Sequence, residues 1–590
     1  MNNLIWFVPI GAVILTTVAP ARASAQTSEE AKLNSFFTKY LEEHFRQQPL
    51  EATQLGDHRF DSALDDVSPA ARDSWLALAR RTLKELPRQA DYKRLTREGQ
   101  IDFEIFQHEL RTQIWLTENT HPFEEDPRTY GGYINDGVYL LLTHSTLPKE
   151  TNISNCLSRM AEIPRIIAAA KTMLTHPPKA ILETAIRQNR GAISFYEKGI
   201  FELAGQTEQL DRLKSAAAVV AAQLKDYQKF LEGDLMSRAN GQWRLGERRF
   251  KRKLELALDC GRSADQVLAD AQAEFGRVRS EMYVVARQLW PSYFPGTVLP
   301  ADDAEGRRET ITKVIDAVSQ EHGQAENLVA DARATVEKIK AFIRERHYLR
   351  LPEPDQCQVI EMPEFRRGNS LAYLDNAPPL DAKARSYYAV SPPPADWTAE
   401  QVRSFLEEYN SQMLQVLTIH EGYPGHYVQL ERANRNPSLI RRAYQSGPFV
   451  EGWAVYGEVT MLNEGYGGGD PRLRLMQQKF YLRTVANAIL DHKMHCTQIS
   501  DEEAMKFLTE EAFQSEGEAK LKLIRAKQSS TQLSSYFVGR MAHYRLHQQI
   551  EREQGREFDL ARYHEAVLSH GSVPVKYLPE LVHADLKLTR

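Results

Sequence analysis

The sequence predicts an all-α fold, mainly helical with a minor β segment, and three stretches of the chain support this. From about residue 29 to residue 350, apolar residues recur at steps of three and four, and turn signals such as His176-Pro177-Pro178 separate the segments. Residues 351–394 are instead rich in proline and aromatic residues, and the alternating run 358–362 predicts a strand. Helical patterning resumes at Thr398 and continues to the C-terminus, apart from a glycine-rich loop at 465–471.

The chain divides into four expected segments: a signal peptide at 1–25, an N-terminal helical region at 26–350, a strand and loop connector at 351–397, and a C-terminal helical region at 398–590. An apolar run from residue 4 to residue 18 precedes small-x-small sites around Ala23, which is the pattern of a cleavable secretory signal. The run is too short for a membrane span, which needs ~20 apolar residues. We therefore expect an exported protein, periplasmic or secreted.

Composition excludes several partners. With 42% hydrophobic residues among 590, the chain can bury a large core. A net charge of −5 gives no basic field, so neither nucleic acid nor an anionic membrane surface is an expected partner. No later apolar run could span a bilayer, and no cysteine stands directly after the signal-like run to carry a lipid, so no membrane anchor is expected. The disulfide state of the four cysteines stays open, because four cysteines allow three pairings: Cys156, Cys260, Cys357 and Cys496.

The C-terminal region opens with an amphipathic helix that carries a histidine inward. Thr398 with Gln401 forms a plausible capping box. Apolar residues then follow at steps of three and four from Val402 to Leu417, and the same face continues to His420. The imidazole of His420 is thus predicted to lie in the interior, where it needs a partner.

The run His420-Glu421-Gly422-Tyr423-Pro424-Gly425-His426 is close to the zinc-peptidase motif H-E-x-x-H. In that motif two histidines one turn apart bind zinc, and the glutamate acts as a general base. Here the second histidine comes at i+6, ~240° around a regular helix, which would aim the rings apart. Because proline disrupts a helix and glycine adopts unusual dihedrals, a two-residue bulge at Pro424-Gly425 could return His426 to the face of His420.

A third ligand is expected from a later helix. Glu451 and Glu458 are seven residues apart and share a face with apolar side chains, which is unusual for carboxylates unless a cation neutralises them. Zinc held by His420, His426 and Glu451 is one such arrangement. The alternative is ordinary structure: hydrogen-bonded core histidines, with the glutamates in salt bridges or near a helix N-terminus.

The chain resembles the bacterial family catalogued as domain of unknown function 885, which belongs with the gluzincin-type zinc peptidases. The resemblance rests on five motifs: residues 49–56, 420–426 and 451–458, Asp491 with His495, and Tyr563-His564-Glu565 with 571–574. It departs from the family pattern at Tyr427, where a second histidine is usual, and at Asn487, where an arginine is usual. The resemblance implies a large helical body split by a deep active-site cleft, with the region 26–350 forming one side and the region 398–590 carrying the zinc.

A more distant similarity is to angiotensin-converting enzyme. Tyr536-Phe537-Val538, with His547 eleven positions after the tyrosine, looks like the helix on which that enzyme carries its oxyanion-stabilising tyrosine. Carried over, Tyr536 would donate to the oxyanion. Ala526 stands where that enzyme has a histidine, and a core tyrosine is the alternative interpretation.

Together these features predict a zinc-dependent metallopeptidase acting on short or unfolded peptides. Glu421 would be the general base and Tyr536 the oxyanion donor, with Zn(2+) as the cofactor. Zinc-bound histidines usually donate their other N–H to a carboxylate or carbonyl, which makes four residues candidates for holding the ligands: Glu458, Asp491, His495 and His564. A zinc hydrolase of non-peptide amides or esters, and a catalytically silent binding protein, remain alternatives. The oligomeric state is open.

Overall fold

The computed structural model describes residues 28–362, 371–394 and 397–588. Helices dominate these ranges, and a small three-stranded sheet interrupts them, so the predicted mainly helical class is confirmed. No helix in the described ranges is long and apolar enough to cross a membrane. The predicted signal peptide at 1–25 lies outside the described residues, and the segment boundaries and the cleft stay predictions.

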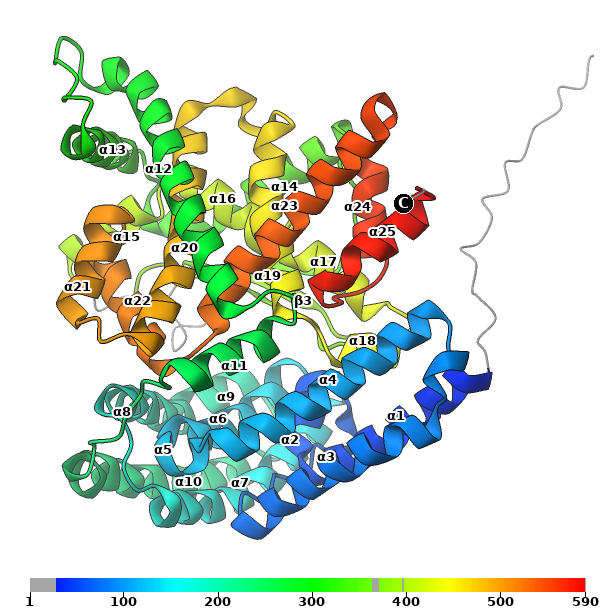
Figure 1. The fold of residues 1–590 in the computed structure, drawn as a ribbon. Coiled ribbons are helices and arrows are strands. Elements are labelled where there is room, and N and C mark those ends of the chain that lie inside the picture. Colours follow the sequence, from blue (N-terminus) through cyan, green and yellow to red (C-terminus); the bar gives the residue numbers. More distant parts are fainter. Residues whose placement is uncertain (1–27, 363–370, 395–396, 589–590) are drawn as a thin grey trace, which may run out of the picture.

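The N-terminal helices form the lower layer of the molecule in Figure 1. Many begin at a residue that satisfies the free backbone N–H groups of the first turn; Ser68, for example, accepts from Ala71 and is followed by a proline. The helices of this layer are α1 (Ser28–Gln47), α2 (Pro49–Leu55), α3 (Pro69–Gln89), α4 (Arg97–Asn119), α5 (Pro122–Glu125), α6 (Pro127–Thr143), α7 (Lys149–Met173), α8 (Lys179–Ser194), α9 (Ile200–Ala204), α10 (Leu210–Phe230) and α11 (Glu247–Leu258).

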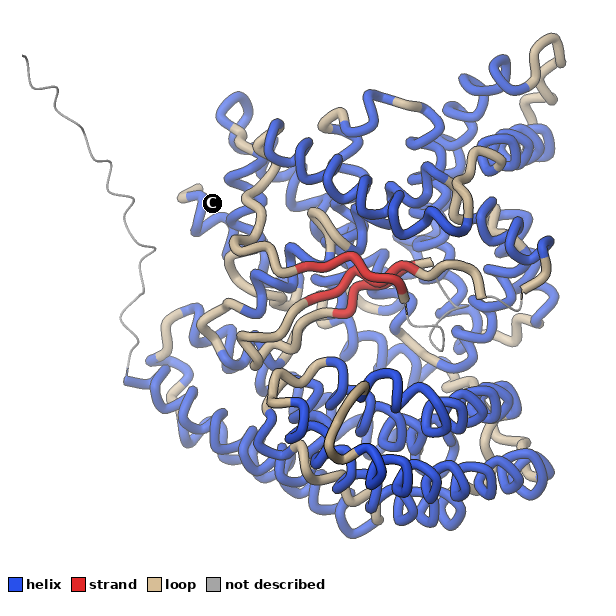
Figure 2. Tube along the Cα trace, turned by 180° about the vertical axis from the view of Figure 1, so that it is seen from behind, coloured by secondary structure: helices blue, strands red, loops and turns tan. Residues whose placement is uncertain are grey.

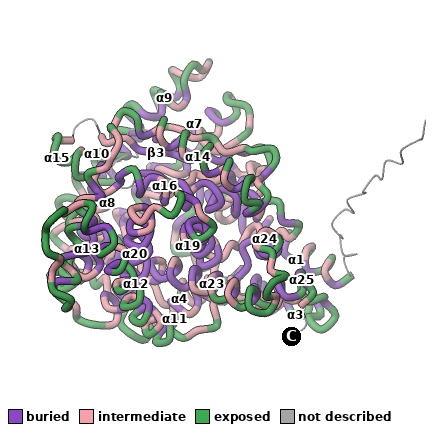
Figure 3. The backbone as a smooth tube through the Cα atoms, turned by 90° about the horizontal axis from the view of Figure 1, so that it is seen from above, coloured by how far each residue is buried: buried purple, intermediate pink, exposed green. Residues whose placement is uncertain are grey.

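The remaining helices form the upper part of Figure 1. They are α12 (Ala264–Tyr293), α13 (Ala304–Ser319), α14 (Leu328–Glu345), α15 (Ala399–Glu408), α16 (Ser411–Glu421), α17 (His426–Asn434), α18 (Leu439–Ala443), α19 (Gly447–Asn463), α20 (Pro471–Cys496), α21 (Asp501–Lys506), α22 (Glu516–Gln528), α23 (Ser535–Gln554), α24 (Leu560–Leu568) and α25 (Leu578–Leu586). Seen from above in Figure 3, α16, α19 and α20 lie in the buried centre.

The buried apolar side chains of the described residues form three hydrophobic cores, the smallest of them between α20, α21 and α22, and the largest cuts across the order of the sequence. The largest core runs from Leu33 in α1 to Leu586 in α25 and joins α1, α3, α4 and α11 to the C-terminal helices. The second core lies mainly among α6 to α10, from Leu64 to Leu235. Because the first and last helices share one core, the ends of the described chain depend on each other for burial.

A small sheet lies between the upper and lower helices (Figure 2). Strand β3 (Ser386–Val390) is central; it pairs in parallel with β1 (Cys357–Glu361) and antiparallel with β2 (Ala372–Asp375). The strand predicted at 358–362 is thus found one residue earlier. The Tyr388 hydroxyl lies 3.1 Å from Thr418 Oγ1, which ties the central strand to α16.

The single helix predicted from Thr398 to His420 is wrong, because the chain forms two helices there. The capping box of Thr398 and Gln401 is present at the start of α15. The chain then leaves the helix at Tyr409, and the side chain of Asn410 accepts from Gln412 N and Met413 N, both at 3.1 Å, to begin α16. An asparagine cap competes with helix continuation even where the apolar period is unbroken.

Helices α19 and α23 pack unusually close together, and two glycines allow it. A Cβ on Gly452 would lie 2.2 Å from the backbone carbon of Gly539, and a Cβ on Gly539 would lie 1.7 Å from the carbonyl oxygen of Pro448. Any side chain here would push the helices apart. The contact fixes the residue beside Gly452, which is Glu451, relative to the first turn of α23.

The four cysteines are free thiols. Cys156 is buried in the core of the lower layer.

Candidate metal centre

The turn between α16 and α17 brings the two histidines together. Helix α16 ends at Glu421, and α17 begins at His426, so a complete interruption of the helix replaces the expected two-residue bulge. Gly425 makes the turn possible, because a Cβ there would lie 1.9 Å from the carbonyl oxygen of His420. The two imidazole rings lie with centroids 4.7 Å apart and planes at 85°.

Glu451 reaches both histidines from α19. Its Oε2 atom lies 3.8 Å from His420 Nε2 and 3.3 Å from His426 Nε2. Ligands ~2.0–2.1 Å from a tetrahedral zinc ion are ~3.3 Å from one another, so these separations match the edges of a zinc tetrahedron. Oε2 is also sealed from solvent, with no hydrogen-bond donor among the described residues. The three side chains therefore fit a zinc ion.

The charges of this cluster also favour a cation. Burial lowers the pKa of His420, but contacts with Glu451 and Glu458 more than offset this, and its pKa rises to about 10. Burial opposes the ionisation of Glu451, yet the two histidines hold the pKa of its carboxyl far below the usual value. Both shifts show that the carboxylates stabilise positive charge at the histidine nitrogens, which a metal ion can supply in place of a proton.

Glu458 orients His420. Its Oε1 lies 2.8 Å from His420 Nδ1, and Gln477 Nε2 donates to its Oε2 at 3.4 Å. Because the carboxylate accepts, Nδ1 carries the hydrogen and Nε2 is left to face Glu451. Glu458 is fully buried, and burial raises its pKa. His426 differs: its Nδ1 is buried and has no hydrogen-bond partner in the described part of the chain.

Glu421 faces the same centre and is held by the sheet. Ligand atoms of His420, Glu421 and His426 all lie within 4.8 Å of one another. The backbone N–H of Leu374 in β2 donates to Glu421 Oε2 at 2.9 Å. Glu421 and Glu451 are thus both close enough to compete as the third ligand. Glu451 fits the position of a third ligand better, because its Oε2 lies within 3.8 Å of both Nε2 atoms and accepts no hydrogen bond from the described residues, whereas Glu421 already accepts one.

Tyr536 lies in the first turn of α23. Arg525 Nη2 and Gln532 Nε2 each lie 3.4 Å from its hydroxyl oxygen. Burial, with the negative charge of Glu451, raises the pKa of Tyr536 to about 12. The tyrosine therefore keeps its proton at neutral pH and lies within the electrostatic field of Glu451.

Asp491 and His495 lie in a network that supports the start of α23. Asp491 accepts from Thr531 N at 3.1 Å and from Ser534 Oγ at 3.0 Å, and burial raises its pKa to about 7. His495 Nε2 lies 3.1 Å from the carbonyl oxygen of Ala526, at the end of α22. These contacts join α20 to the segment just before Tyr536 and do not include His420 or His426.

His564 contacts residues outside the centre. Its Nε2 is 2.8 Å from the Tyr456 hydroxyl, and its Nδ1 is 3.0 Å from the carbonyl oxygen of Tyr348. Burial lowers the pKa of His564 to about 3, so it is a neutral residue of the interior. His547 Nδ1 lies 2.9 Å from the same Tyr456 hydroxyl.

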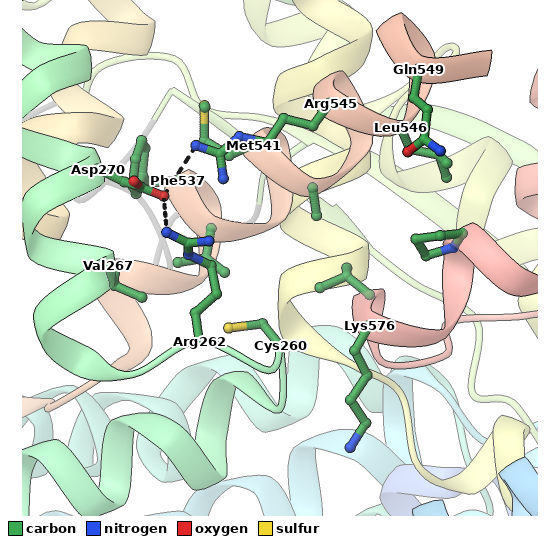
Figure 4. A pocket seen from close by; sticks show the side chains of 14 residues that line it. Cys260, Arg262, Val267, Asp270, Phe537, Met541, Arg545, Leu546, Gln549 and Lys576 are labelled. Carbon is green, nitrogen blue, oxygen red and sulfur yellow. Dashed lines mark hydrogen bonds and ion pairs between the residues drawn. The ribbon is translucent and has the colours of Figure 1, made fainter. Parts of the chain in front are cut away.

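A cavity of about 320 Å³ is lined along α23 by residues between Phe537 and Gln549, and none of the residues of the candidate centre lines it (Figure 4). Its floor is apolar, and the charged groups at its edge are paired: Asp270 accepts from Arg262 at 2.9 Å and from Arg545 at 3.1 Å. Among the described residues, no cluster of metal-binding side chains lines this cavity.

The sequence prediction missed several residues: Leu374 donates to Glu421, Gln477 donates to Glu458 and Arg525 lies beside the Tyr536 hydroxyl, while Lys522 lies near the charges of Arg483 and Arg525. Lys522 could have been noticed, because it lies on the buried face of α22 with Ala519, Leu523 and Ala526. Leu374 acts through its backbone, so its side-chain type carries no signal.

The fold and this centre define a mainly helical protein in which buried histidines 420 and 426 lie beside one buried glutamate, Glu458, and two half-buried ones, Glu421 and Glu451, in an arrangement that fits a metal ion. The chain belongs to the family described as bacterial protein of unknown function (DUF885), whose sequence profile matches residues 49–582.

Two solved structures are similar over almost the whole chain. One is a "putative lipoprotein of unknown function" from Shewanella oneidensis, 30% identical, covering 93% of this chain and 99% of its own, with a TM-score of 0.79. The other, from Colwellia psychrerythraea, is 17% identical, covering 95% of this chain and 100% of its own, with a TM-score of 0.76. No curated protein matches this chain.

Proposed function

We propose that this protein is a zinc-dependent metallopeptidase that hydrolyses peptide bonds of short or unfolded peptides. The observation that carries the proposal is the position of Glu451 Oε2, which lies 3.3 and 3.8 Å from two imidazole nitrogens and accepts no hydrogen bond within the described part of the chain. A structural ion pair would need no adjacent glutamate such as Glu421, whereas peptide hydrolysis needs a base.

His420, His426 and Glu451 would hold the zinc ion, and Glu458 would keep His420 in the tautomer that presents Nε2. Zinc, when bound, supplies a Lewis acid for the scissile carbonyl and lowers the pKa of water toward ~7. The protein's own residues account for the proton transfers. Glu421, oriented by the Leu374 N–H, accepts a proton from the attacking water and passes it to the leaving amine.

Tyr536 would donate its hydroxyl hydrogen to the oxyanion. Because the pKa of Tyr536 is raised to about 12, the phenol remains a donor at neutral pH. The distant similarity to angiotensin-converting enzyme at this helix supports the same role.

Strand β2 favours a peptide over other amides or esters. Its Leu374 N–H points away from β3 and toward Glu421, so the outer edge of the sheet passes beside the base. An extended peptide can bind such an edge through main-chain hydrogen bonds. A substrate without a peptide main chain could not form these hydrogen bonds with the edge of β2.

Export is part of the proposal. The segment 1–25 has the pattern of a cleavable signal, and both similar structures are named as putative lipoproteins. We propose that the mature chain works in the periplasm or outside the cell.

The test compares Glu421→Gln with the wild-type mature chain. We expect about one zinc ion per chain in both proteins, and a kcat at least ~10²-fold lower in the variant, because general-base catalysis contributes ~10²–10⁴-fold. Zinc is measured by elemental analysis, and turnover by mass spectrometry of a peptide library alongside small amides and esters. A variant that keeps more than a tenth of the wild-type kcat, or a wild-type chain that cleaves only the small esters, would overturn the proposal.

A further inference from the structure

A polar cavity lies apart from the candidate metal centre, between α13, α15, α20 and the segment that joins α21 to α22. Its volume is about 220 Å³, several times the ~30 Å³ that one water molecule occupies in the liquid. None of the residues proposed to bind zinc or to act in hydrolysis lines it. Hydroxyl side chains are frequent in its wall: Thr312, Ser319, Ser404, Thr509 and Ser515. The cavity can therefore hold a small polar molecule.

Gln514 lines this cavity and carries an amide group without a partner. The residue is 6% exposed, and neither its Oε1 nor its Nε2 forms a hydrogen bond with another described residue. A buried amide group normally has partners, because it is costly to remove one from water without replacing its hydrogen bonds. Gln514 thus offers both an acceptor and donors to a molecule that binds in the cavity.

The backbone that leads to Gln514 adopts two uncommon conformations. Phe513, which also lines the cavity, has a φ of 54°, in the left-handed region that a bulky residue rarely adopts. The preceding segment Phe507–Glu511 is a single π-helical turn. Strained residues and single π-helical turns both occur often at functional sites. In this chain they position Gln514 at the wall of the cavity.

The charged groups of the cavity leave two carboxylates without an opposite charge. Glu408 pairs with Lys479 at 3.0 Å, whereas Asp316 and Glu407 form no ion pair with any described residue. Partial burial raises the pKa of Asp316, opposed by the charge of Lys479 and reinforced by that of Glu407, so these charges lie close enough to interact. In the described part of the chain, no third ligand completes a metal site with them. Two like charges beside one cavity favour an organic cation.

We propose that this cavity binds a small amino polyol, which is a molecule with several hydroxyl groups and a protonated amine, such as an amino sugar. The ammonium group binds to Asp316 and Glu407 through charge-assisted hydrogen bonds. The Gln514 amide exchanges hydrogen bonds with a hydroxyl group of the ligand, because a hydroxyl both donates and accepts. The ring of Phe513 supplies an apolar surface for the carbon skeleton. This site goes beyond the proposed peptidase function and does not depend on it.

The first test compares glucosamine with glucose, which has a hydroxyl group in place of the amine on the same skeleton. Each sugar is titrated into the wild-type mature chain by ligand-observed NMR, just below neutral pH so that the amine is protonated. We expect glucosamine to bind at least 10-fold more tightly, since a hydrogen bond to a charged group contributes ~10- to 150-fold. Equal affinities for the two sugars would overturn the proposal, and no binding of either would show that only water fills the cavity.

The second test places the amine within the cavity. Glu407→Gln should weaken the binding of glucosamine at least 10-fold and leave that of glucose unchanged, because only a charge is removed. Gln514→Leu should weaken the binding of both sugars, since it removes hydrogen bonds that either can form. The matched control is Glu400→Gln in the first turn of the same helix, where the glutamate is exposed and does not line the cavity.

The control variant should bind both sugars as the wild-type chain does. If Glu407→Gln bound glucosamine as tightly as this control, the amine would not lie beside Glu407 and the assignment would be wrong. Both tests measure binding alone and need no cleaved peptide. Their outcome is therefore separate from that of the peptidase proposal.

Discussion

Replacing Gly452 by alanine should damage both the stability and the activity of the protein. The added Cβ would lie 2.2 Å from the backbone carbon of Gly539, while ordinary contacts begin at 3.4 Å, so α19 and α23 must separate by about 1.2 Å at this point. Overpacking of this kind costs ~1–3 kcal/mol. The three nearest obstructing atoms all belong to the backbone of Gly539, so no side chain can rotate away to relieve the clash.

The same movement would separate Glu451 from Tyr536, because Glu451 precedes Gly452 and Tyr536 lies one turn before Gly539. A misplacement of ~1 Å can lower a rate ~10²-fold. The measurements are the urea midpoint, the zinc content and the kcat on a cleaved peptide. Gly447→Ala is the matched control in the same helix, because its Cβ would meet nothing closer than the Ser535 hydroxyl at 3.8 Å. If Gly452→Ala matched this control in all three measurements, the close helix contact would not position the centre as we argue.

The remaining predictions concern individual groups of the centre. Tyr536→Phe should lower kcat and kcat/KM together by ~10²–10³-fold with KM and melting temperature nearly unchanged; unchanged kinetics with a lower melting temperature would make it a structural tyrosine. Glu458→Gln should weaken zinc binding ~10- to 100-fold, measured by competition with a chelator, and unaltered affinity would contradict its orienting role. His420→Ala, His426→Ala and Glu451→Ala should each lose the metal by elemental analysis, and full occupancy in the Glu451 variant would transfer the third ligand to Glu421.

Patterns within a few residues of the sequence predicted the features that depend on neighbouring residues alone. The helical periodicity, the capping box at Thr398 and the strand near residue 358 all follow from neighbours within a few positions. The pairing of His420 with His426 could be anticipated because Pro424-Gly425 forbids a regular helix between them. The length of the break between the two helices could not be anticipated, because it depends on how closely Gly425 packs on the carbonyl oxygen of His420.

Tertiary contacts explain what the sequence could not show. The motif of Asp491 and His495 is easy to see, yet its partners are Thr531, Ser534 and Ala526, which only the fold brings near. The closeness of Lys522 to Arg483 is likewise not visible along the chain, because the two residues are 39 positions apart. The sequence would instead suggest that Lys522 pairs with Glu518, four positions earlier, but Glu518 pairs with Arg483.

The core shared by the first and last helices limits how this protein can be shortened or recombined. Leu33 of α1 and Ile101 of α4 pack in the same core as Val455 and Leu586. A fragment starting at residue 398 would contain every proposed ligand yet expose one side of that core to water, at ~25 cal/mol for each Å² of apolar surface left uncovered. Such a fragment should aggregate. We therefore expect that expression and domain exchange succeed only when the helices from α1 to α25 are kept together.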